Sequence, residues 1–169
     1  MVVTRAPTRI DLGGGWTDVP PYCDREGGFV CNVAINRYAT ATIGPGESTE
    51  TEDALVAAMV RRLELETAAV SLVSDFPVSA GLGGSSSAIA ALLVAAAELR
   101  GVTWNRAEIA EAGRLFEVED LGVAGGRQDY YAATFGGALA LTFGAGIEVR
   151  RIPLDAQRGA EFSRRSVLI

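Results

Sequence analysis

Residues 77–88, PVSAGLGGSSSA, form the part of the chain whose residue types best suit chemistry. An extended apolar stretch precedes them and a long alanine-rich stretch follows, which predicts a strand, a tight loop and a helix in that order. Glycines let a backbone approach an anion closely, and the first turn of a helix offers unpaired N–H groups and the positive end of its dipole. Serine hydroxyls can bind phosphate or reach a metal ion. The pattern predicts a phosphate-binding loop that needs no lysine, made of Gly81, Leu82, Gly83, Gly84, Ser85, Ser86 and Ser87.

Two other interpretations of this loop remain open from the residues alone. A flexible turn followed by a serine-capped helix needs no ligand at all. A dinucleotide-binding loop is the second alternative, because Gly81 and Gly83 have the spacing that opens such a motif. Its third position is Ser86 rather than glycine, and no acidic residue follows a second strand about 20 residues later. Three glycines and three serines before a buried helix favour phosphate binding.

A second group of candidates lies downstream, in residues 117–137, EVEDLGVAGGRQDYYAATFGG. Phosphoryl transfer requires a magnesium ion held by oxygen ligands, a cation, and a group that accepts or orients the hydroxyl proton. Asp129 follows a glycine-rich loop, where its carboxylate could face a cleft, and Glu117 lies near the end of an expected helix. Arg127 is close enough in sequence to hold anionic charge.

The same acids also have purely structural interpretations. Asp129 could cap a short helix over residues 130–135, because aspartate favours that position. Glu119 and Asp120 are typical of solvated surface acids. The residues alone do not choose between a base and a cap at position 129.

The composition excludes several kinds of site. The 169-residue chain has no histidine, and its 15 basic side chains are all arginine. Histidine-dependent hydrolases, His-containing zinc sites, Schiff-base chemistry and the lysine-containing P-loop are therefore excluded. The two cysteines, Cys23 and Cys31, are too few for a disulfide framework or a cysteine metal site.

Charge and hydropathy set expectations for partners and location. The formal net charge is -6 and the arginines form only isolated pairs, so we expect no nucleic-acid partner. No apolar run approaches the roughly 20 residues of a membrane span, and the N-terminus lacks the features of a signal peptide. We therefore expect a cytoplasmic protein without a membrane partner. The sequence does not indicate an oligomeric state.

Strands and helices follow each other without strict alternation, which predicts an α+β domain with a mixed sheet covered by the helices over 85–100 and 106–119. Loops are expected at 16–27 and 120–127 and a turn at 44–50, and Asn105 with Glu108 suggests a capping box. The expected strands are 2–12, 28–43, 68–74, 138–143 and 147–154, and the expected helices are 52–66, 85–100, 106–119 and 128–135.

Taken together, these segments resemble the GHMP kinases, the family of galactokinase, homoserine kinase, mevalonate kinase and phosphomevalonate kinase. Three stretches match in the family's order. Residues 6–18, APTRIDLGGGWTD, resemble its N-terminal substrate motif, residues 77–87 its nucleotide loop, and residues 117–129 its metal-and-base segment. The resemblance covers nearly all of the chain and implies an ATP-dependent kinase that uses Mg²⁺.

The resemblance implies roles for individual residues. Asp129 matches the catalytic base, and Arg9 matches the basic residue beside the reacting hydroxyl. Ser85 and Glu117 match the two magnesium ligands. Elementary chemistry agrees on the types, because magnesium prefers hard oxygen ligands and the acceptor needs a carboxylate nearby.

The substrate side resembles one branch of the family. Residues 13–28, GGGWTDVPPYCDREGG, are most similar to fucokinases and heptose-phosphate kinases, and residues 125–137 point the same way. The implied contacts with the sugar or sugar phosphate are Trp16, Thr17 and Asp18. The implied reaction is phosphoryl transfer to a sugar hydroxyl, as in a sugar 1-kinase.

The chain departs from the family's pattern in three ways. Gly84 stands where the family has the first serine of the loop. The connection from the strand near Tyr38 to Pro77 looks short, as if a strand or helix were missing. The family also has a C-terminal domain, so we expect residues 1–160 to be the ATP-binding and catalytic domain. Residues 161–169 are then a stub, whose apolar last residues read as a strand cut off from its sheet.

Three function hypotheses follow. The first is the sugar kinase. The second is a non-catalytic fragment that binds a nucleotide or a sugar, because half of the usual fold is absent. The third is a dinucleotide-dependent oxidoreductase.

Overall fold

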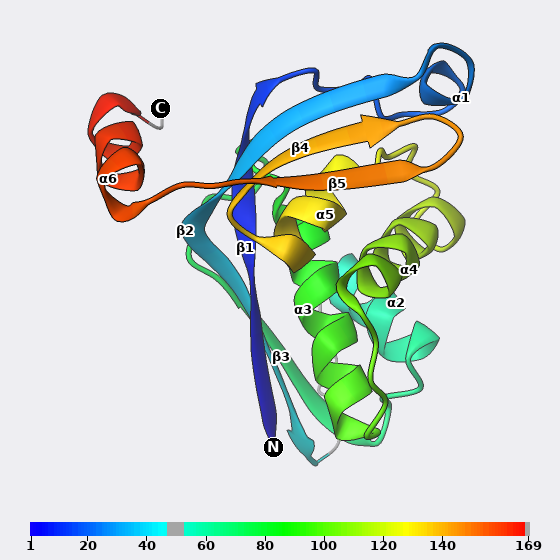
Figure 1. Ribbon diagram of the computed structural model, residues 1–169. Helices are drawn as coiled ribbons and strands as arrows, with labels where there is room; N and C mark the ends of the chain where they lie inside the picture. The colour runs from blue at the N-terminus through cyan, green and yellow to red at the C-terminus, as the bar shows by residue number, and fades with distance from the viewer. Residues whose placement is uncertain (47–52, 168–169) are drawn as a thin grey trace.

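One long strand organises the sheet. In the computed structural model, which describes residues 1–46 and 53–167, the sheet has five strands in the order β1-β2-β4-β5, with β3 also paired to β2. The strands are β1 (Val2–Gly13), β2 (Gly28–Pro45), β3 (Ala68–Ser74), β4 (Ala138–Phe143) and β5 (Ile147–Ile152). Figure 1 shows β2 running along the whole length of the sheet. Residues 28–33 of β2 pair with β4, and residues 39–45 pair with β3.

The sheet is irregular where β2 changes partner. There the register between β1 and β2 shifts between Pro7 and Arg9. The backbone N–H of Arg9 donates instead to the carbonyl of Leu82, at 3.0 Å. A register irregularity of this kind redirects side chains and often lies beside a functional site. The bulge therefore brings the glycine-serine loop against β1.

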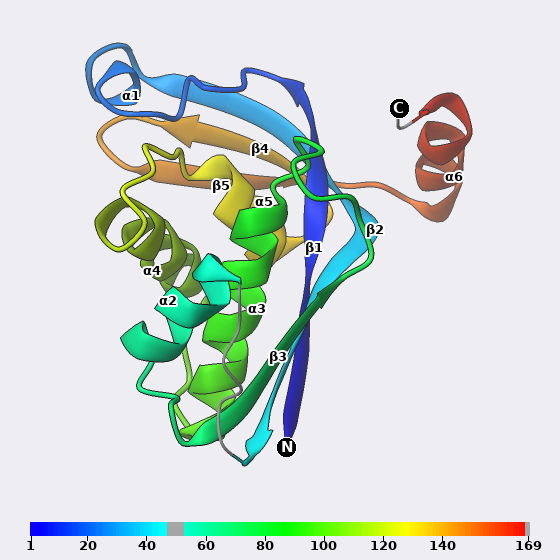
Figure 2. The ribbon, with the colours of Figure 1, turned by 180° about the vertical axis from the view of Figure 1, so that it is seen from behind.

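The helices form layers on one face of the sheet. The helices α3 (Gly84–Leu99) and α5 (Gln128–Phe135) lie against β1 and β2. The helix α4 (Arg106–Glu119) packs on α3 and α5, and α2 (Ala54–Arg62) packs on α3. Figures 1 and 2 show this arrangement from opposite sides, with the other face of the sheet free of these helices.

The central helix α3 is buried because it is apolar nearly all round. Ile89 and Leu92 have no exposed surface and join the core that also contains Leu139 and Leu141 of β4. The outer helix α4 also packs closely on the layer beneath it. A Cβ at Gly113 of α4 would lie 2.6 Å from the ring of Tyr130 in α5, so glycine allows these two helices to touch.

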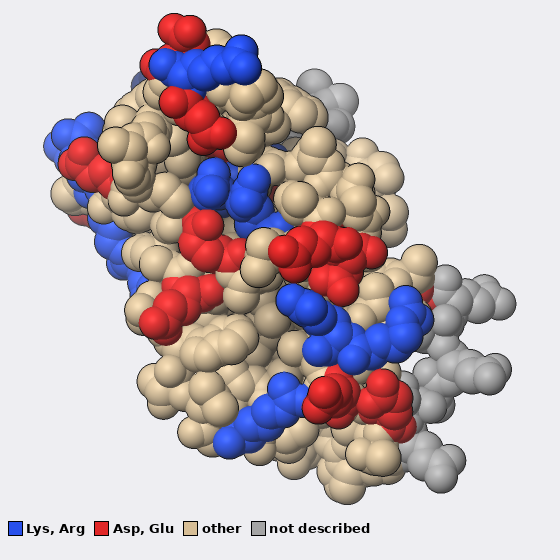
Figure 3. All heavy atoms as spheres, turned by 90° about the vertical axis from the view of Figure 1, so that its right-hand side faces the viewer, with Lys and Arg blue, Asp and Glu red and all other residues tan. Residues whose placement is uncertain are grey.

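Acidic and basic side chains alternate on the face that carries α2 and α4. Figure 3 shows small red and blue groups side by side on this face. Arg62 of α2 forms ion pairs at 3.7 Å with Glu119, the last residue of α4, and with Asp120, which follows it. The two acids are surface residues, as the sequence predicted. No helix in residues 1–46 and 53–167 is long and apolar enough to cross a membrane.

Most predicted elements are present with nearly the predicted bounds. The α+β class is confirmed, and Asn105 and Glu108 form the predicted capping box at the start of α4. The predicted turn over 44–50 and the start of the predicted helix over 52–66 lie partly outside the described residues. The connection from Tyr38 to Pro77, which looks short for the family, contains α2 and β3, as the sequence predicted.

Four details of the prediction were wrong. Every described strand pair is antiparallel, so the sheet is not mixed. The helix over 106–119 covers α3 and α5 rather than the sheet. The predicted loop over 16–27 contains a short helix, α1 (Tyr22–Glu26). The predicted stub over 161–169 begins in the middle of a helix, α6 (Ala156–Arg165); residues 166–167 after it are not in a strand, and residues 168–169 lie outside the described residues.

The antiparallel sheet also removes the dinucleotide hypothesis. That type of site needs parallel strands with the glycine loop at a strand-to-helix crossover. Among the described residues the strand before the loop, β3, pairs antiparallel with β2. The loop then crosses to β1 before α3 begins.

The burial of α3 predicts a large difference between two leucines of the same helix. Leu92 is fully buried and Leu99 is 44% exposed. Leu92→Ala leaves a cavity, so it should lower the free energy of unfolding by about 2–5 kcal/mol. Leu99→Ala is the matched control and should change it by at most about 0.5 kcal/mol. Urea unfolding followed by circular dichroism measures both, and equal losses would contradict the packing described here.

Candidate active site

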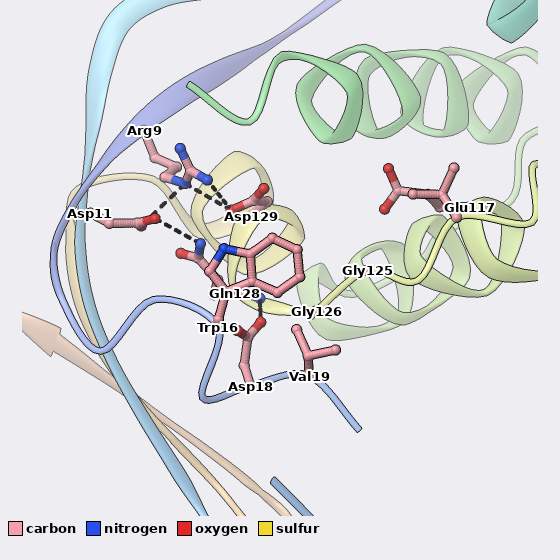
Figure 4. A pocket seen from close by; sticks show the side chains of 11 residues that line it. Arg9, Asp11, Trp16, Asp18, Val19, Glu117, Gly125, Gly126, Gln128 and Asp129 are labelled. Carbon is pink, nitrogen blue, oxygen red and sulfur yellow. Dashed lines mark hydrogen bonds and ion pairs between the residues drawn. The ribbon is translucent and has the colours of Figure 1, made fainter. Parts of the chain in front are cut away.

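Arg9 is the residue on which the site converges. It is 8% exposed, and its side chain leaves β1 at the bulge. Its Nε and Nη2 both lie 2.7 Å from Oδ1 of Asp129, and Nη1 donates to the carbonyl of Gly81 at 2.6 Å. The Nε atom is also 3.2 Å from Oδ1 of Asp11. One guanidinium therefore joins the loop, α5 and β1, as Figure 4 shows for the two carboxylates.

Asp129 is a residue of the first turn of α5, and it is not the cap of that helix. The helix begins at Gln128 with Arg127 at the N-cap position, and no side chain of this residue caps it. Burial raises the pKa of the Asp129 carboxyl to about 6, against the lowering effect of Arg9. The negative charges of Asp11 and Asp18 add to the rise. A carboxyl of this pKa is ionised at neutral pH and is still basic enough to accept a proton.

The glycine-serine loop ends at the N-terminus of α3. Gly83, with φ of 70°, is the N-cap of α3, and it makes no side-chain cap bond. The first amides of the helix are therefore available to an anion. A Cβ on Gly83 would lie 3.3 Å from the carboxyl of Asp129, so glycine also permits close contact with α5.

The three serines have different surroundings. Ser85 is exposed, and its Oγ donates to Oε1 of Glu117 at 3.3 Å, so the two implied magnesium ligands lie together. Ser86 is 3% exposed and lies at the floor of the hollow beside the loop. Ser87 is 1% exposed, and its Oγ lies 2.7 Å from the carbonyl of Pro7. Ser87 thus ties α3 to β1 and does not line the hollow, although the sequence predicted it as a nucleotide contact.

Gly84 is explained by its neighbour. A Cβ at this position would lie 2.5 Å from Cε2 of Phe76. A serine here, as the family pattern has, would require the Phe76 ring to move. Glycine at position 84 therefore leaves room for the ring of Phe76, which lies just before the loop.

Two hollows meet at the site. The larger one, about 450 Å³, lies along the loop and includes Gly81 to Ser86. The smaller one, about 180 Å³, includes Arg9, Asp11, Trp16 and Asp18. Glu117 and Asp129 line both of them. These two carboxylates therefore stand where a ligand in one hollow would meet a ligand in the other.

The predicted substrate residues do not all face the smaller hollow. Trp16 lines it, with φ of 71° and 74% of its surface exposed. Asp18 lines it and is 1% exposed. Thr17 does not line it, because its Oγ1 donates to the carbonyl of Gly14 at 2.6 Å and accepts from the backbone N–H of Phe29 at 3.1 Å. Thr17 fastens the loop to β2, so its prediction as a substrate contact is not supported by its position.

Sequence reasoning missed a polar network behind the smaller hollow. The side-chain amide of Gln128 donates to Oδ2 of Asp11 at 2.9 Å and accepts from Nδ2 of Asn32 at 2.9 Å. Asn32 is fully buried and Gln128 is 7% exposed. Asp11 could have been found, because residues two apart on a strand share a face and Arg9 was already a candidate. Asn32 and Gln128 carried no local signal, since their pairing depends on the packing of α5 on β2.

Arg127 and Tyr130, two other side chains near the site, have structural roles. The Arg127 Nε lies 3.1 Å from Oε2 of Glu111 in α4, so this arginine is not free to hold a ligand's charge as the sequence suggested. The Tyr130 hydroxyl is fully buried. Burial, with the charge of Glu117 second, raises the pKa of this hydroxyl and keeps it protonated.

Comparison with known proteins agrees with this geometry. Residues 53–137, which include the loop, α3, α4 and α5, match the model of the GHMP kinases N terminal domain. The chain belongs to the GHMP kinases. The matched residues contain the glycine-serine loop and, after it, the acidic segment, and the structure brings both against Arg9.

Three of the similar proteins are named as kinases of sugars or sugar phosphates. The chain is 33% identical over 163 residues to a D-glycero-alpha-D-manno-heptose 7-phosphate kinase of Campylobacter jejuni, covering 79% of this chain and 48% of that protein. It is 27% identical to an L-fucokinase/L-fucose-1-P guanylyltransferase of Bacteroides fragilis, covering 84% of this chain and 20% of that protein. The crystal structure of a D-glycero-D-manno-heptose 1-phosphate kinase from Bacteroides thetaiotaomicron has a TM-score of 0.82, with 28% identity over 93% of this chain and 61% of that one. The chain thus spans about half or less of the length of these curated relatives.

The different surroundings of two serines predict different effects of the same change. Ser85→Ala removes an exposed hydroxyl beside Glu117, so Mg-ATP should bind about tenfold more weakly while stability stays the same. Ser87→Ala removes a buried hydrogen bond to Pro7, so it should lower the free energy of unfolding by about 1 kcal/mol. Calorimetric titration and urea unfolding of both variants separate the two effects. The reverse pattern would show that Ser87, and not Ser85, contacts the nucleotide.

Proposed function

We propose that this chain carries the ATP-binding and catalytic half of a sugar kinase, which transfers the γ-phosphoryl group of ATP to a sugar hydroxyl. One observation carries the proposal: Asp129 and Glu117 stand where the hollow along the glycine-serine loop meets the hollow beside Arg9. A phosphoryl transfer needs two ligands that meet end to end, with a carboxylate at their junction.

The larger hollow suits the nucleotide. Its loop presents the uncapped start of α3, and its volume of about 450 Å³ admits a polyphosphate chain. The proposal assigns the phosphates to residues 81–86. Ser87 helps only by holding the helix to β1.

The residues also fit a magnesium ion that arrives with ATP. Ser85 and Glu117 supply two hard oxygen atoms 3.3 Å apart at the edge of the loop. Among the described residues no group of three or more His, Cys, Asp or Glu side chains could hold a metal alone. Magnesium is commonly held by one or two protein oxygens with phosphates and water completing its shell. When bound, the ion would neutralise negative charge on the phosphates.

Asp129 and Arg9 suit the acceptor side. A sugar hydroxyl in the smaller hollow could donate its proton to the carboxylate of Asp129. The Arg9 guanidinium, which already contacts Asp129 at 2.7 Å, would stabilise negative charge that develops on the hydroxyl oxygen. The exposed ring of Trp16 at the mouth of the hollow could pack against a sugar face.

The relatives suggest the acceptor. Their names combine a heptose phosphate and fucose, so we propose a sugar or a sugar phosphate, with a fucokinase-like 1-kinase or a heptose 7-phosphate kinase-like reaction as the two forms. We also propose that a second domain follows the catalytic one, because the match covers only 48% of the Campylobacter jejuni relative. The predicted boundary at residue 160 falls inside α6, so the linker at residues 153–155 is a better place for it.

Binding without turnover is the second candidate, because the chain spans 48% of the Campylobacter jejuni relative. A coupled assay of ADP release with a panel of sugars separates the two. It should be run on this chain and on the intact protein. Turnover by the intact protein and none by this chain would make the chain a binding part of a kinase. Turnover by neither would overturn the proposed function.

The first test of the mechanism is Asp129→Asn in the intact protein. The change keeps the shape of the side chain and removes its charge and basicity. The variant should fold and bind ATP normally, and its kcat should fall by at least about 100-fold. Asp120→Asn is the matched control, because Asp120 is a surface acid paired with Arg62, and its kcat should not change. Near-parental turnover by Asp129→Asn would remove Asp129 from the mechanism.

The second test is the pH dependence of kcat/KM. Only the ionised carboxylate accepts a proton, and burial raises the pKa of Asp129 to about 6. The rate should therefore be constant above about pH 7 and fall tenfold per unit below about pH 6. The charge of Asp11 contributes to the raised pKa, so Asp11→Asn should move the fall to lower pH. A profile that does not respond to Asp11→Asn would contradict the assignment.

A further inference from the structure

Asp18 is a buried carboxylate that reaches across the molecule. It lies in the segment between β1 and α1 and is 1% exposed. Its Oδ2 accepts from the backbone N–H of Arg127 at 2.6 Å and from that of Gln128 at 2.9 Å. Figure 4 shows the carboxylate directly below the start of α5. These partners follow it by 109 and 110 residues in the chain.

The helix α5 has no cap of its own. It has eight residues, too few to be stable in isolation, and its N-cap residue, Arg127, makes no side-chain cap bond. The Arg127 guanidinium is directed to Glu111, so only its backbone meets Asp18. A carboxylate at a helix N-terminus receives charge-assisted hydrogen bonds and the favourable end of the helix dipole. Asp18 therefore does for α5 what a local capping residue usually does.

The backbone of residue 126 is shaped around the same carboxylate. A Cβ on Gly126 would lie 1.9 Å from Oδ2 and 2.4 Å from Cγ of Asp18. Both atoms belong to a short, buried side chain that is held by two hydrogen bonds, so it cannot swing away easily. Glycine at 126 is thus an independent sign that the contact between this loop and Asp18 is built into the fold.

We propose that Asp18 is a positioning residue: its carboxylate holds the first turn of α5 and so sets the place of Asp129 beside Arg9. The proposal rests on the proposed kinase function, in which Asp129 is the base. Asp129 is the second residue of α5, one position after an amide that Asp18 holds. A shift of this turn would move the carboxylate away from its 2.7 Å contact with Arg9. This role differs from sugar binding, which would use the side of Asp18 that faces the smaller hollow.

Three changes test the role in the intact protein. Asp18→Ala removes the acceptor, Asp18→Asn keeps one acceptor oxygen without the charge, and Gly126→Ala forces the loop from the carboxylate. Gly144→Ala is the matched control, because a Cβ there has nothing within 4 Å and the turn lies between β4 and β5. The readouts are kcat, KM for the sugar, and hydrogen exchange of the Arg127 and Gln128 amides.

A positioning role predicts a loss of kcat. Asp18→Ala and Gly126→Ala should lower kcat about 100-fold, the scale of a misplaced catalytic group, with a smaller change in KM. The exchange protection of the two amides should fall by at least about tenfold as the start of α5 frays. Asp18→Asn should recover most of the protection and most of kcat. If Asp18→Ala does not fold, the other two variants still give both readouts.

Other outcomes would overturn the proposal. A rise in KM with unchanged kcat in both Asp18 variants would make Asp18 a sugar contact only. Unchanged exchange in Asp18→Ala would show that α5 does not depend on it, whatever the activity. A parent protein that phosphorylates no sugar would overturn the proposed function instead, and the exchange result alone would then decide whether Asp18 holds α5.

Discussion

The buried guanidinium of Arg9 is the constraint on which the site depends. A buried cation is costly unless its donors are satisfied and its charge is paired. Its partners come from three places: the carboxylate of Asp129 in α5, that of Asp11 in β1, and the carbonyl of Gly81 in the loop. The backbone of Arg9 also holds Leu82, so the loop is fixed twice. None of these contacts is local in sequence except that with Asp11, and the site therefore assembles only when α3 and α5 pack on β1.

Arg9 pairs with both Asp129 and Asp11, and this sharing affects the basicity of Asp129. Arg9 lowers the pKa of Asp129, but burial and the charges of Asp11 and Asp18 act in the opposite direction and prevail. A carboxylate whose charge was fully neutralised by one arginine would be a poor base. With two carboxylates on one guanidinium, Asp129 is held in place and still retains affinity for a proton. In a simple ion pair, the contact that fixes the position of a carboxylate also lowers its basicity. Here Asp129 keeps both its position and its basicity.

The sequence predicted what depends on local signals. The bounds of α4 follow from the Asn105 capping box, and α3 follows from its apolar composition and the loop before it. Ser85, Glu117 and Asp129 were candidates from their residue types and positions, and motif resemblance gave them specific roles and added Arg9. The sequence did not show that Ser87 and Thr17 are occupied by backbone groups, because those partners, at Pro7 and at Phe29, are set by tertiary packing. The antiparallel sheet and the network of Asn32 and Gln128 depend on packing in the same way. The helix α6 is different, because it has no buried residue and Asp155 caps it locally.

Three glycines show how motifs far apart in the chain form one unit. Gly83 leaves room for the Asp129 carboxyl, Gly84 for the ring of Phe76, and Gly126 for the carboxylate of Asp18. From the sequence, glycines at these positions indicate flexible loops, and a flexible loop could adjust to a bound phosphate. In the structure each one instead marks a close contact with a side chain, so the absence of a Cβ serves rigidity. The N-terminal motif reaches α5 through Asp18, and α5 reaches the loop through Asp129 and Gly83. A shift in the position of any one of these three segments should therefore move the other two, because each contacts the next directly. The three motifs are separate in the sequence but form one packed unit in the folded chain.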